Sequence, residues 1–307
     1  MLSSLLRKSN CIAQLFFCVM GMGVIMKKGY IYTALSAIIF GLMPLLTKII
    51  IARGATSLTI PFFRVFYVTI VLFFVLKIKK IDLHLEKRDL LSVILTSIFG
   101  SGLTIIILNE SYNYVDTGIA TSLHFLYPLF VAILCCFFYG EKIKKKQILS
   151  LSFALVGIIC FMSKGNGSLF GYFLAIASGL TYAFYLVKMD KSGLVKMNAL
   201  KLSFYLALFT TIEIFTMNLF MQDVVFKMDV LSYVLLLVLA LSSSFLATVL
   251  LQKGVLLLGS TRASFICLLE PVTSMIVGIL WLNEALTFNK GLGGLAIIVS
   301  LIIFLKE

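Results

Sequence analysis

Glu270 and Pro271 stand side by side in the apolar stretch LLEPVTSMIVGILWLNEAL, at residues 268–286. A carboxylate inside an apolar helix is costly unless it is paired, hydrated or protonated. Glu270 would bind a cationic part of a substrate or exchange a proton, and the alternative is a structural hydrogen bond to a neighbouring helix. Pro271 removes the amide hydrogen that would bond to the carbonyl of Cys267. The pair therefore predicts a helix kink and a polar spot that lines a cavity.

A second stretch, FLYPLFVAILCCFFYGEK at residues 125–142, follows the same pattern. Thirteen residues separate Pro128 from Glu141, and the same number separates Pro271 from Glu284. Pro128 predicts a second kink. Each glutamate comes just before the next apolar run, where a negative charge is favourable at a helix N-terminus. We expect both glutamates to act as structural caps.

Polar residues gather on one face of each of these two stretches. Helical spacing gives the first face Thr121, His124 and Pro128, and the second face Ser264, Cys267, Pro271 and Ser274. Glu270 borders the second face, and Tyr127 is its counterpart beside the first. His124 can titrate near neutral pH, or it can be an inert side chain bonded to a backbone carbonyl. We expect these residues to line one substrate cavity.

Other candidates for the cavity wall lie in other apolar runs. Asn109 and Gln252 occupy equivalent positions in two runs, which indicates a shared role in substrate contact or in bonding between helices. Aromatic walls and hydroxyls would come from Tyr182, Tyr185, Ser36 and Phe40, with ordinary packing as the alternative for each. The six cysteines show no metal-ligand spacing, so no metal site and no cofactor are expected.

Two further charges lie inside apolar runs. Arg64 would extend its guanidinium toward the membrane surface or pair with backbone carbonyls. Glu213 is an alternative proton carrier.

These side chains must be positioned by membrane helices. Hydrophobic residues make up 61% of the 307 residues, and the mean hydropathy is +1.10, so the class is an all-α integral membrane protein. The net charge of +13 lies mostly between apolar runs, where it sets topology and does not indicate a nucleic-acid partner. Ten spans are predicted, at residues 29–52, 57–77, 89–110, 116–139, 146–163, 169–188, 198–221, 230–258, 261–282 and 287–305.

The distribution of Lys and Arg predicts the orientation. With the N-terminus in the cytoplasm, the outside connections keep only Lys48, Arg53, Lys164, Lys227 and Lys290. The other connections carry most of the basic residues, so both termini should be cytoplasmic. For residues 1–26, a start at Met26 is favoured because MKKGY suits a cytoplasmic N-terminus; a cleaved signal or an eleventh helix are the alternatives.

The sequence contains a weak internal duplication. An offset of 143 residues relates Leu108 to Leu251, Ala120 to Ala263 and Pro128 to Pro271. One repeat would occupy residues 27–165 and the other residues 166–307. Because five helices is an odd number, the second repeat must enter the membrane upside down. Two inverted five-helix repeats are typical of secondary transporters.

The pattern resembles the drug/metabolite transporter superfamily, EamA type. The resemblance rests on Pro128 with Gly140 and Glu141, and on Pro271 with Asn283 and Glu284, where Asn283 departs from the usual glycine. It implies ATP-independent movement of small metabolites, often export of amino acids or related compounds, across a bacterial cytoplasmic membrane.

Several other functions compete with a carrier. The chain has neither a GxxxxGK[ST] motif for nucleotide binding nor an HExxH motif for a metalloprotease. An intramembrane enzyme, a channel, a lipid flippase and a non-transporting membrane subunit of the same fold remain as alternatives. The expected partners are a small-molecule substrate and the lipid bilayer, and protons and a second copy of the chain, in a homodimer, are further candidates.

Overall fold

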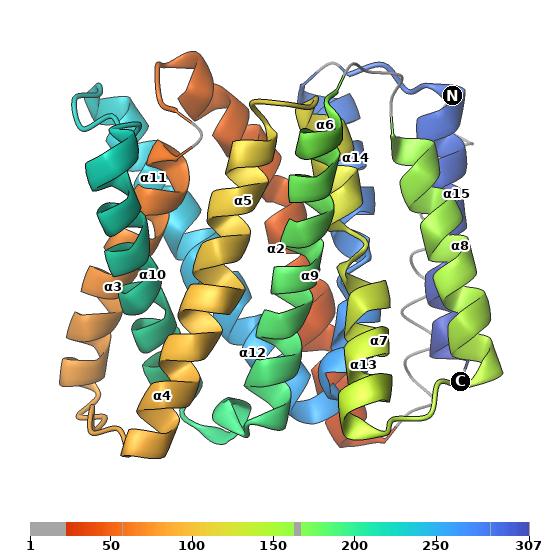
Figure 1. Ribbon diagram of the computed structural model, residues 1–307, viewed down its shortest axis with the longest axis horizontal. Coiled ribbons are helices and arrows are strands. Elements are labelled where there is room, and N and C mark those ends of the chain that lie inside the picture. The colour runs from red at the N-terminus through yellow and green to blue at the C-terminus, as the bar shows by residue number, and fades with distance from the viewer. Residues whose placement is uncertain (1–22, 57, 163–166, 283, 307) are drawn as a thin grey trace.

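The computed structural model of the protein describes residues 23–56, 58–162, 167–282 and 284–306. Its elements are helices arranged side by side in one bundle (Figure 1). The all-α fold class is therefore confirmed. Most of the N-terminal extension predicted at residues 1–26 lies outside the described residues, which begin at Gly23.

The first repeat forms five membrane spans in the described part of the chain. They are α2 (Val24–Ala52); α3 (Thr59–Ile78); α4 (Lys87–Thr96) with η1 (Ser97–Gly102) and α5 (Leu103–Ser111); α6 (Thr117–His124) with α7 (Tyr127–Tyr139); and α8 (Lys145–Phe161). At 17 residues α8 is about 25 Å long, which is near the lower limit for crossing a bilayer.

The second repeat forms the other five spans within the described ranges. They are α9 (Leu169–Lys191), which is followed by the short η2 (Leu194–Lys196); α10 (Ala199–Met221); α11 (Val230–Leu239) with η3 (Ala240–Ala247) and α12 (Thr248–Leu258); α13 (Ser260–Ile266) with α14 (Leu269–Trp281); and α15 (Phe288–Leu305). Nine of the ten spans have the length and hydropathy of membrane helices, and α8 is the tenth.

The third span of each repeat contains a π-helical segment that we did not predict. These segments, η1 and η3, occupy equivalent positions, because residues 97–102 correspond to residues 240–245 at the offset of 143. An extra residue in a turn leaves the hydropathy of a long apolar run unchanged, so the sequence pattern does not report it. π-Helical turns often occur at functional sites.

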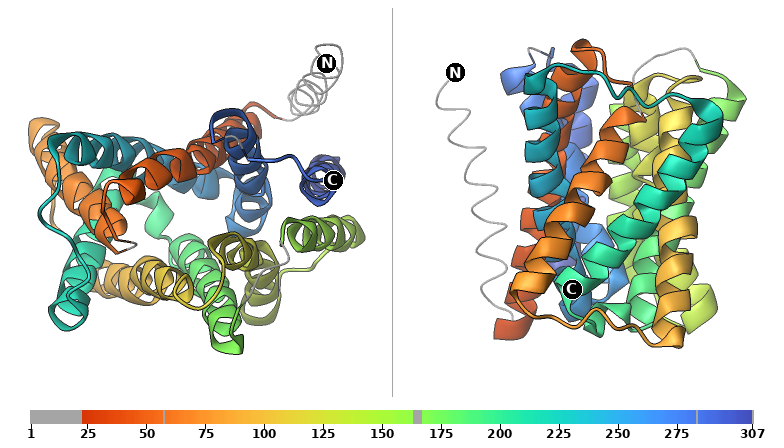
Figure 2. Two further views of the ribbon diagram at one scale, coloured as in Figure 1. Left: turned by 90° about the horizontal axis from the view of Figure 1, so that it is seen from above. Right: turned by 90° about the vertical axis from the view of Figure 1, so that its left-hand side faces the viewer.

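Helices of the two repeats pack against each other throughout the bundle. Helix α2 of the first repeat packs against α12 and α14 of the second. In the equivalent way, α9 of the second repeat packs against α5 and α7 of the first. Seen from above in Figure 2, the helices form a ring in which segments from the two halves of the chain alternate in contact. Residues from both repeats therefore line any space at its centre.

The α8–α15 contact shows the two-fold relation most directly. Ser150 Oγ donates to the Ser300 carbonyl at 2.8 Å, and Ser300 Oγ donates to the Ser150 carbonyl at 2.7 Å. One to two turns away, a Cβ on Gly293 would lie 2.8 Å from the Gly157 carbonyl oxygen. At the offset of 143, Ser150 corresponds to Gly293 and Gly157 corresponds to Ser300. The contact between Ser150 and Ser300 is therefore the repeat counterpart of the contact between Gly293 and Gly157. An antiparallel pair related in this way is the signature of an inverted repeat.

We predict that Gly293→Ala destabilises the protein by about 1–3 kcal/mol, because the new methyl group would meet the backbone of α8, which cannot give way easily. Gly291→Ala is the matched control on the same helix, since a Cβ there meets no atom within 4 Å. Thermal unfolding in detergent micelles measures both. Equal melting temperatures for the two variants would contradict the close approach of α8 and α15.

Candidate functional site

The fourth span of each repeat is interrupted just before its proline. Helices α6 and α7 are separated at Phe125 and Leu126, and α13 and α14 at Cys267 and Leu268. The expectation that Pro271 leaves the Cys267 carbonyl free is wrong, because this carbonyl accepts the amide of Glu270 at 2.9 Å. The tight turn that forms there places Glu270 in the first turn of α14, midway along the span Ser260–Trp281.

Glu270 lies near a positive charge from the first repeat. Arg64, on α3, is within electrostatic range of Glu270, Tyr112 and Tyr182. Its Nε donates to Ser244 Oγ in η3 at 2.8 Å. The prediction that Arg64 extends toward the membrane surface or pairs with backbone carbonyls is therefore wrong. Arg64 Nη1 also lies 2.6 Å from the Met43 Sδ, so the π-helical segment and α2 together hold the guanidinium inside the bundle.

Four aromatic rings from the predicted site lie beside this charged pair. The ring centroids of Tyr127 and Tyr182 are 4.8 Å apart, those of His124 and Tyr182 5.4 Å apart, and those of Tyr182 and Tyr185 5.6 Å apart. Tyr127 and Tyr182 also lie within electrostatic range of Glu270. The rings thus form one wall beside the acid.

His124 is anchored in this wall by a side chain. Its Nδ1 lies 3.0 Å from the Ser178 Oγ on α9. The observed partner of His124 is therefore a serine side chain, in place of the backbone carbonyl that we considered. Ser178 in turn donates to the Ala175 carbonyl at 2.6 Å, which fixes the position of its hydroxyl.

Two buried polar groups of the predicted site have no hydrogen-bond partner in the described part of the protein. They are the Tyr127 hydroxyl and both polar atoms of the Gln252 amide, and these side chains are 0% and 1% exposed. The Tyr185 hydroxyl and the Cys267 thiol lie near them without a hydrogen bond of normal geometry. Leaving such groups unsatisfied costs about 1–3 kcal/mol each. A polar ligand would supply the missing bonds.

Five other candidates contact their own or neighbouring helices. Ser36 donates to the Ala247 carbonyl at 2.8 Å, Thr121 to Thr117 at 2.7 Å, Asn109 to Ile105 at 2.7 Å and Ser264 to Thr261 at 2.8 Å. Phe40 packs against the largest hydrophobic core. The amides of Asn109 and Gln252 therefore differ in their surroundings, although they are equivalent in the repeat.

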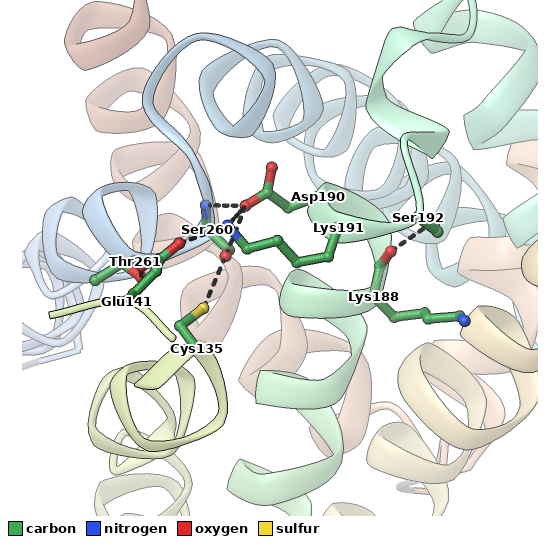
Figure 3. Close-up of polar contacts among 8 residues, drawn as sticks. All are labelled: Cys135, Glu141, Lys188, Asp190, Lys191, Ser192, Ser260 and Thr261. Carbon is green, nitrogen blue, oxygen red and sulfur yellow. Dashed lines mark hydrogen bonds and ion pairs between the residues drawn. The ribbon is translucent and has the colours of Figure 1, made fainter. Parts of the chain in front are cut away.

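Glu141 and Glu284 do not cap the helices that follow them, which corrects that prediction. The N-cap residues of α8 and α15 are Lys144 and Thr287. Each glutamate instead pairs with a lysine of the other repeat at the end of the bundle, and Figure 3 shows this for Glu141. Glu284 also pairs through its second carboxylate oxygen with Lys290, on the first turn of α15, at 3.0 Å.

Glu213 lies apart from the charged pair of the site. A side chain on Gly102 of η1 would collide with its carboxylate, so Glu213 packs closely against the π-helical segment. One carboxylate oxygen is buried without a hydrogen-bond partner. Nearby, the Ser101 and Thr210 hydroxyls bond to each other at 2.8 Å.

Sequence reasoning missed three polar residues of the site, Tyr112, Ser178 and Ser244. Two signals in the chain point to Ser178 and Ser244. Ser178 lies four residues before Tyr182 and thus on the same helical face. Ser244 is the repeat counterpart of Ser101. In the ranges that the structure describes, no three His, Cys, Asp or Glu side chains lie close enough to share a metal ion.

The family model of EamA-like transporters matches residues 27–163 and matches again at residues 169–306. The chain belongs to the EamA-like transporter family. It is a membrane transporter, and the resemblance to this family in its proline and glutamate pattern is confirmed.

Relatives of this EamA-like transporter support the assignment. An "uncharacterized transporter" of Archaeoglobus fulgidus is 25% identical, covering 92% of this chain and 98% of its own. Another, from Clostridium kluyveri, is 22% identical over 91% of this chain and 93% of its own. A solved crystal structure of another protein has a TM-score of 0.71 at 13% identity, covering 90% of this chain and 95% of its own, and shows that the fold is shared.

We predict that Gln252→Leu leaves the stability of the transporter unchanged or raises it by about 1 kcal/mol, because the amide has no bond to lose. Ser36→Ala should lower stability by about 1 kcal/mol, since it removes a buried bond between helices. Unfolding of both variants in the same detergent gives the comparison. A loss for Gln252→Leu equal to that for Ser36→Ala would show that the amide is already satisfied inside the protein.

Proposed function

We propose that this protein is a secondary transporter that exports small metabolites, amino acids or related compounds, by alternating access. The observation that carries the proposal is the proximity of Arg64 and Glu270 beside the aromatic wall and the unpartnered amide of Gln252. These groups come from both repeats, and Glu270 lies midway along the interrupted span Ser260–Trp281.

The charged pair supports a substrate that carries both an acid and an amine. A guanidinium binds a carboxylate well, often through two parallel hydrogen bonds. A carboxylate such as Glu270 binds an ammonium group. The faces of Tyr127 and Tyr182 would contact an apolar or cationic part of the same molecule.

Inverted repeats support alternating access. Two repeats with the same fold can exchange conformations, so that a central site faces first one side of the membrane and then the other. The interrupted fourth spans and the π-helical segments occur at matching positions in both halves, which gives both halves the same points of bending. We assign proton exchange to Glu270, with Glu213 as the alternative carrier. Both termini are assigned to the cytoplasm of a bacterial cell by the positive-inside pattern.

The test is metabolite profiling of a bacterial host that expresses the protein, beside an empty vector and Glu270→Gln at matched membrane expression. We expect one or more amino-acid-like compounds to move out of the cells only with the native protein, and export to persist without ATP when a proton gradient is imposed. Glu270→Gln should lower the export rate about tenfold or more, because it removes a charged hydrogen-bonding group.

Glu213→Gln separates the two candidate proton carriers. If Glu270 carries the proton, Glu213→Gln should retain proton-driven export, and Glu270→Gln should lose its dependence on the gradient. The measurement is the export rate with and without an imposed pH difference. Chemical conversion of a compound without its movement would contradict the transporter and favour an intramembrane enzyme, and full export by Glu270→Gln would make that acid architectural.

A further inference from the structure

We propose that two ion pairs related by the repeat are the gates of the transport cycle, one at each end of the bundle. We call them the Lys191 latch, made of Lys191 with Glu141, and the Lys48 latch, made of Lys48 with Glu284. Each joins the first repeat to the second, and each must break for the site to open at its end. This inference rests on the proposed alternating-access function.

The offset of the repeat connects the two latches. Adding 143 to Glu141 gives Glu284, and adding 143 to Lys48 gives Lys191. The Nζ–Oε1 distance is 2.5 Å in both pairs. The repeat therefore preserves both partners as well as their contact. A chance surface ion pair has no reason to recur at the symmetric position with the same residues.

The latches lie at opposite ends of the bundle. Lys48 is near the end of α2, the first span, and Lys191 is the last residue of α9, the sixth span. An odd span and an even span cross the membrane in opposite directions, so these ends lie on opposite sides. The charged pair of Arg64 and Glu270, within the spans, is thus between the two latches.

The Lys191 latch connects three elements, as Figure 3 shows. Glu141 follows α7, Lys191 ends α9, and Thr261, in the first turn of α13, donates to Glu141 Oε2 at 2.8 Å. Asp190 Oδ2 lies 3.3 Å from the Lys191 Nζ and also accepts hydrogen bonds from the Ser260 amide and hydroxyl at 2.9 Å. The start of α13, in the second repeat, is therefore fastened to the end of α7, in the first.

The Lys48 latch is simpler, and its lysine is more exposed. Glu284 binds Lys48 through one oxygen and Lys290, at the start of α15, through the other at 3.0 Å. The side chain of Lys48 is 54% exposed, whereas that of Lys191 is 23% exposed. Exposed ion pairs contribute little because water screens them. The Lys191 latch is therefore the stronger of the two, and the bundle should open more readily at the Lys48 end.

The glutamates of both latches stay ionised at neutral pH. The hydrogen bond from Lys48 holds the pKa of the Glu284 carboxyl below its ordinary value. Burial acts to raise the pKa of the Glu141 carboxyl, but its bonds to Lys191 and Thr261 outweigh burial and lower it. A carboxylate with a lowered pKa keeps its stabilising pair until the pH falls through that lowered value. Physiological pH changes therefore leave the latches intact, and events at the central site must open them.

Hydrogen exchange of the protein in lipid nanodiscs tests the gates. In Glu141→Gln, amides of residues 140–144 and 192–198, beside the Lys191 latch, should exchange about two- to fivefold faster, in line with a weak ion pair. Amides of residues 53–56 and 284–287, beside the Lys48 latch, should exchange more slowly, because a bundle open at one end is closed at the other. Glu284→Gln should produce the reverse pattern.

Two further variants make the test specific. Lys188→Gln is the matched control, since Lys188 lies one turn before Lys191 and its side chain points away from the Glu141 cluster in Figure 3. It should leave exchange at both ends unchanged. The variant Lys191→Arg keeps a positive charge beside Glu141 and Asp190, and it should leave exchange at both ends close to the native rates.

Faster exchange at the mutated end alone, with no change at the other end, would overturn the latch proposal and leave a local surface ion pair. No change at either end would also overturn it. Failure of the proposed function is a separate result, because it would appear as an absence of export by the native protein. Export by the native protein together with purely local exchange effects would retain the transporter and reject the gates.

Discussion

A polar group inside a bilayer must find its partner within the protein, because the hydrocarbon offers none. Much of the structure follows from this constraint. Hydroxyls such as those of Thr121 and Ser242 bond to carbonyls of the preceding turn, and Ser36 bonds across to η3. Arg64 is held by Ser244 and Met43 and lies within electrostatic range of Glu270. Against this background the unsatisfied amide of Gln252 is an exception, and it is for this reason that we propose it as a contact for a polar substrate.

The inverted repeat gives the bundle a contact that can persist while other contacts change. Ser150 and Ser300, with Gly157 and Gly293, meet around the two-fold relation between α8 and α15. Contacts close to such an axis move little when the two repeats exchange conformations. The ion pairs of Lys48 and Lys191 lie far from the middle of the bundle, where the same exchange produces large displacements. Tight packing of small residues near the axis would hold the two repeats together, whereas weak ion pairs at the ends can break and form again.

Hydropathy and the offset of 143 residues predicted the ten spans and the repeat because both are properties of long segments, to which many side chains contribute. Contacts between single side chains were predicted less well. The roles of Glu141 and Glu284 were wrong, since the sequence does not show that a lysine about fifty residues away in one case and over two hundred in the other reaches the carboxylate. The π-helical segments leave no hydropathy signal. By contrast, the rings of His124, Tyr127, Tyr182 and Tyr185 were selected by type and spacing, and the structure brings them together.

The places where the two repeats agree and differ have a common physical reason. Both ion pairs at the ends have the same residue types, glutamate and lysine, in the two halves, and Ser101 and Ser244 both lie in π-helical segments. At the central site the halves differ: Glu270 corresponds to Tyr127, and Arg64 corresponds to Ala207. A device that closes either end requires equivalence, because each half must perform the same movement in turn. A site for an asymmetric molecule requires difference, because a substrate with an acid at one end and an amine at the other presents no two-fold axis. Symmetry at the ends and asymmetry at the centre are therefore what a carrier of such a molecule needs.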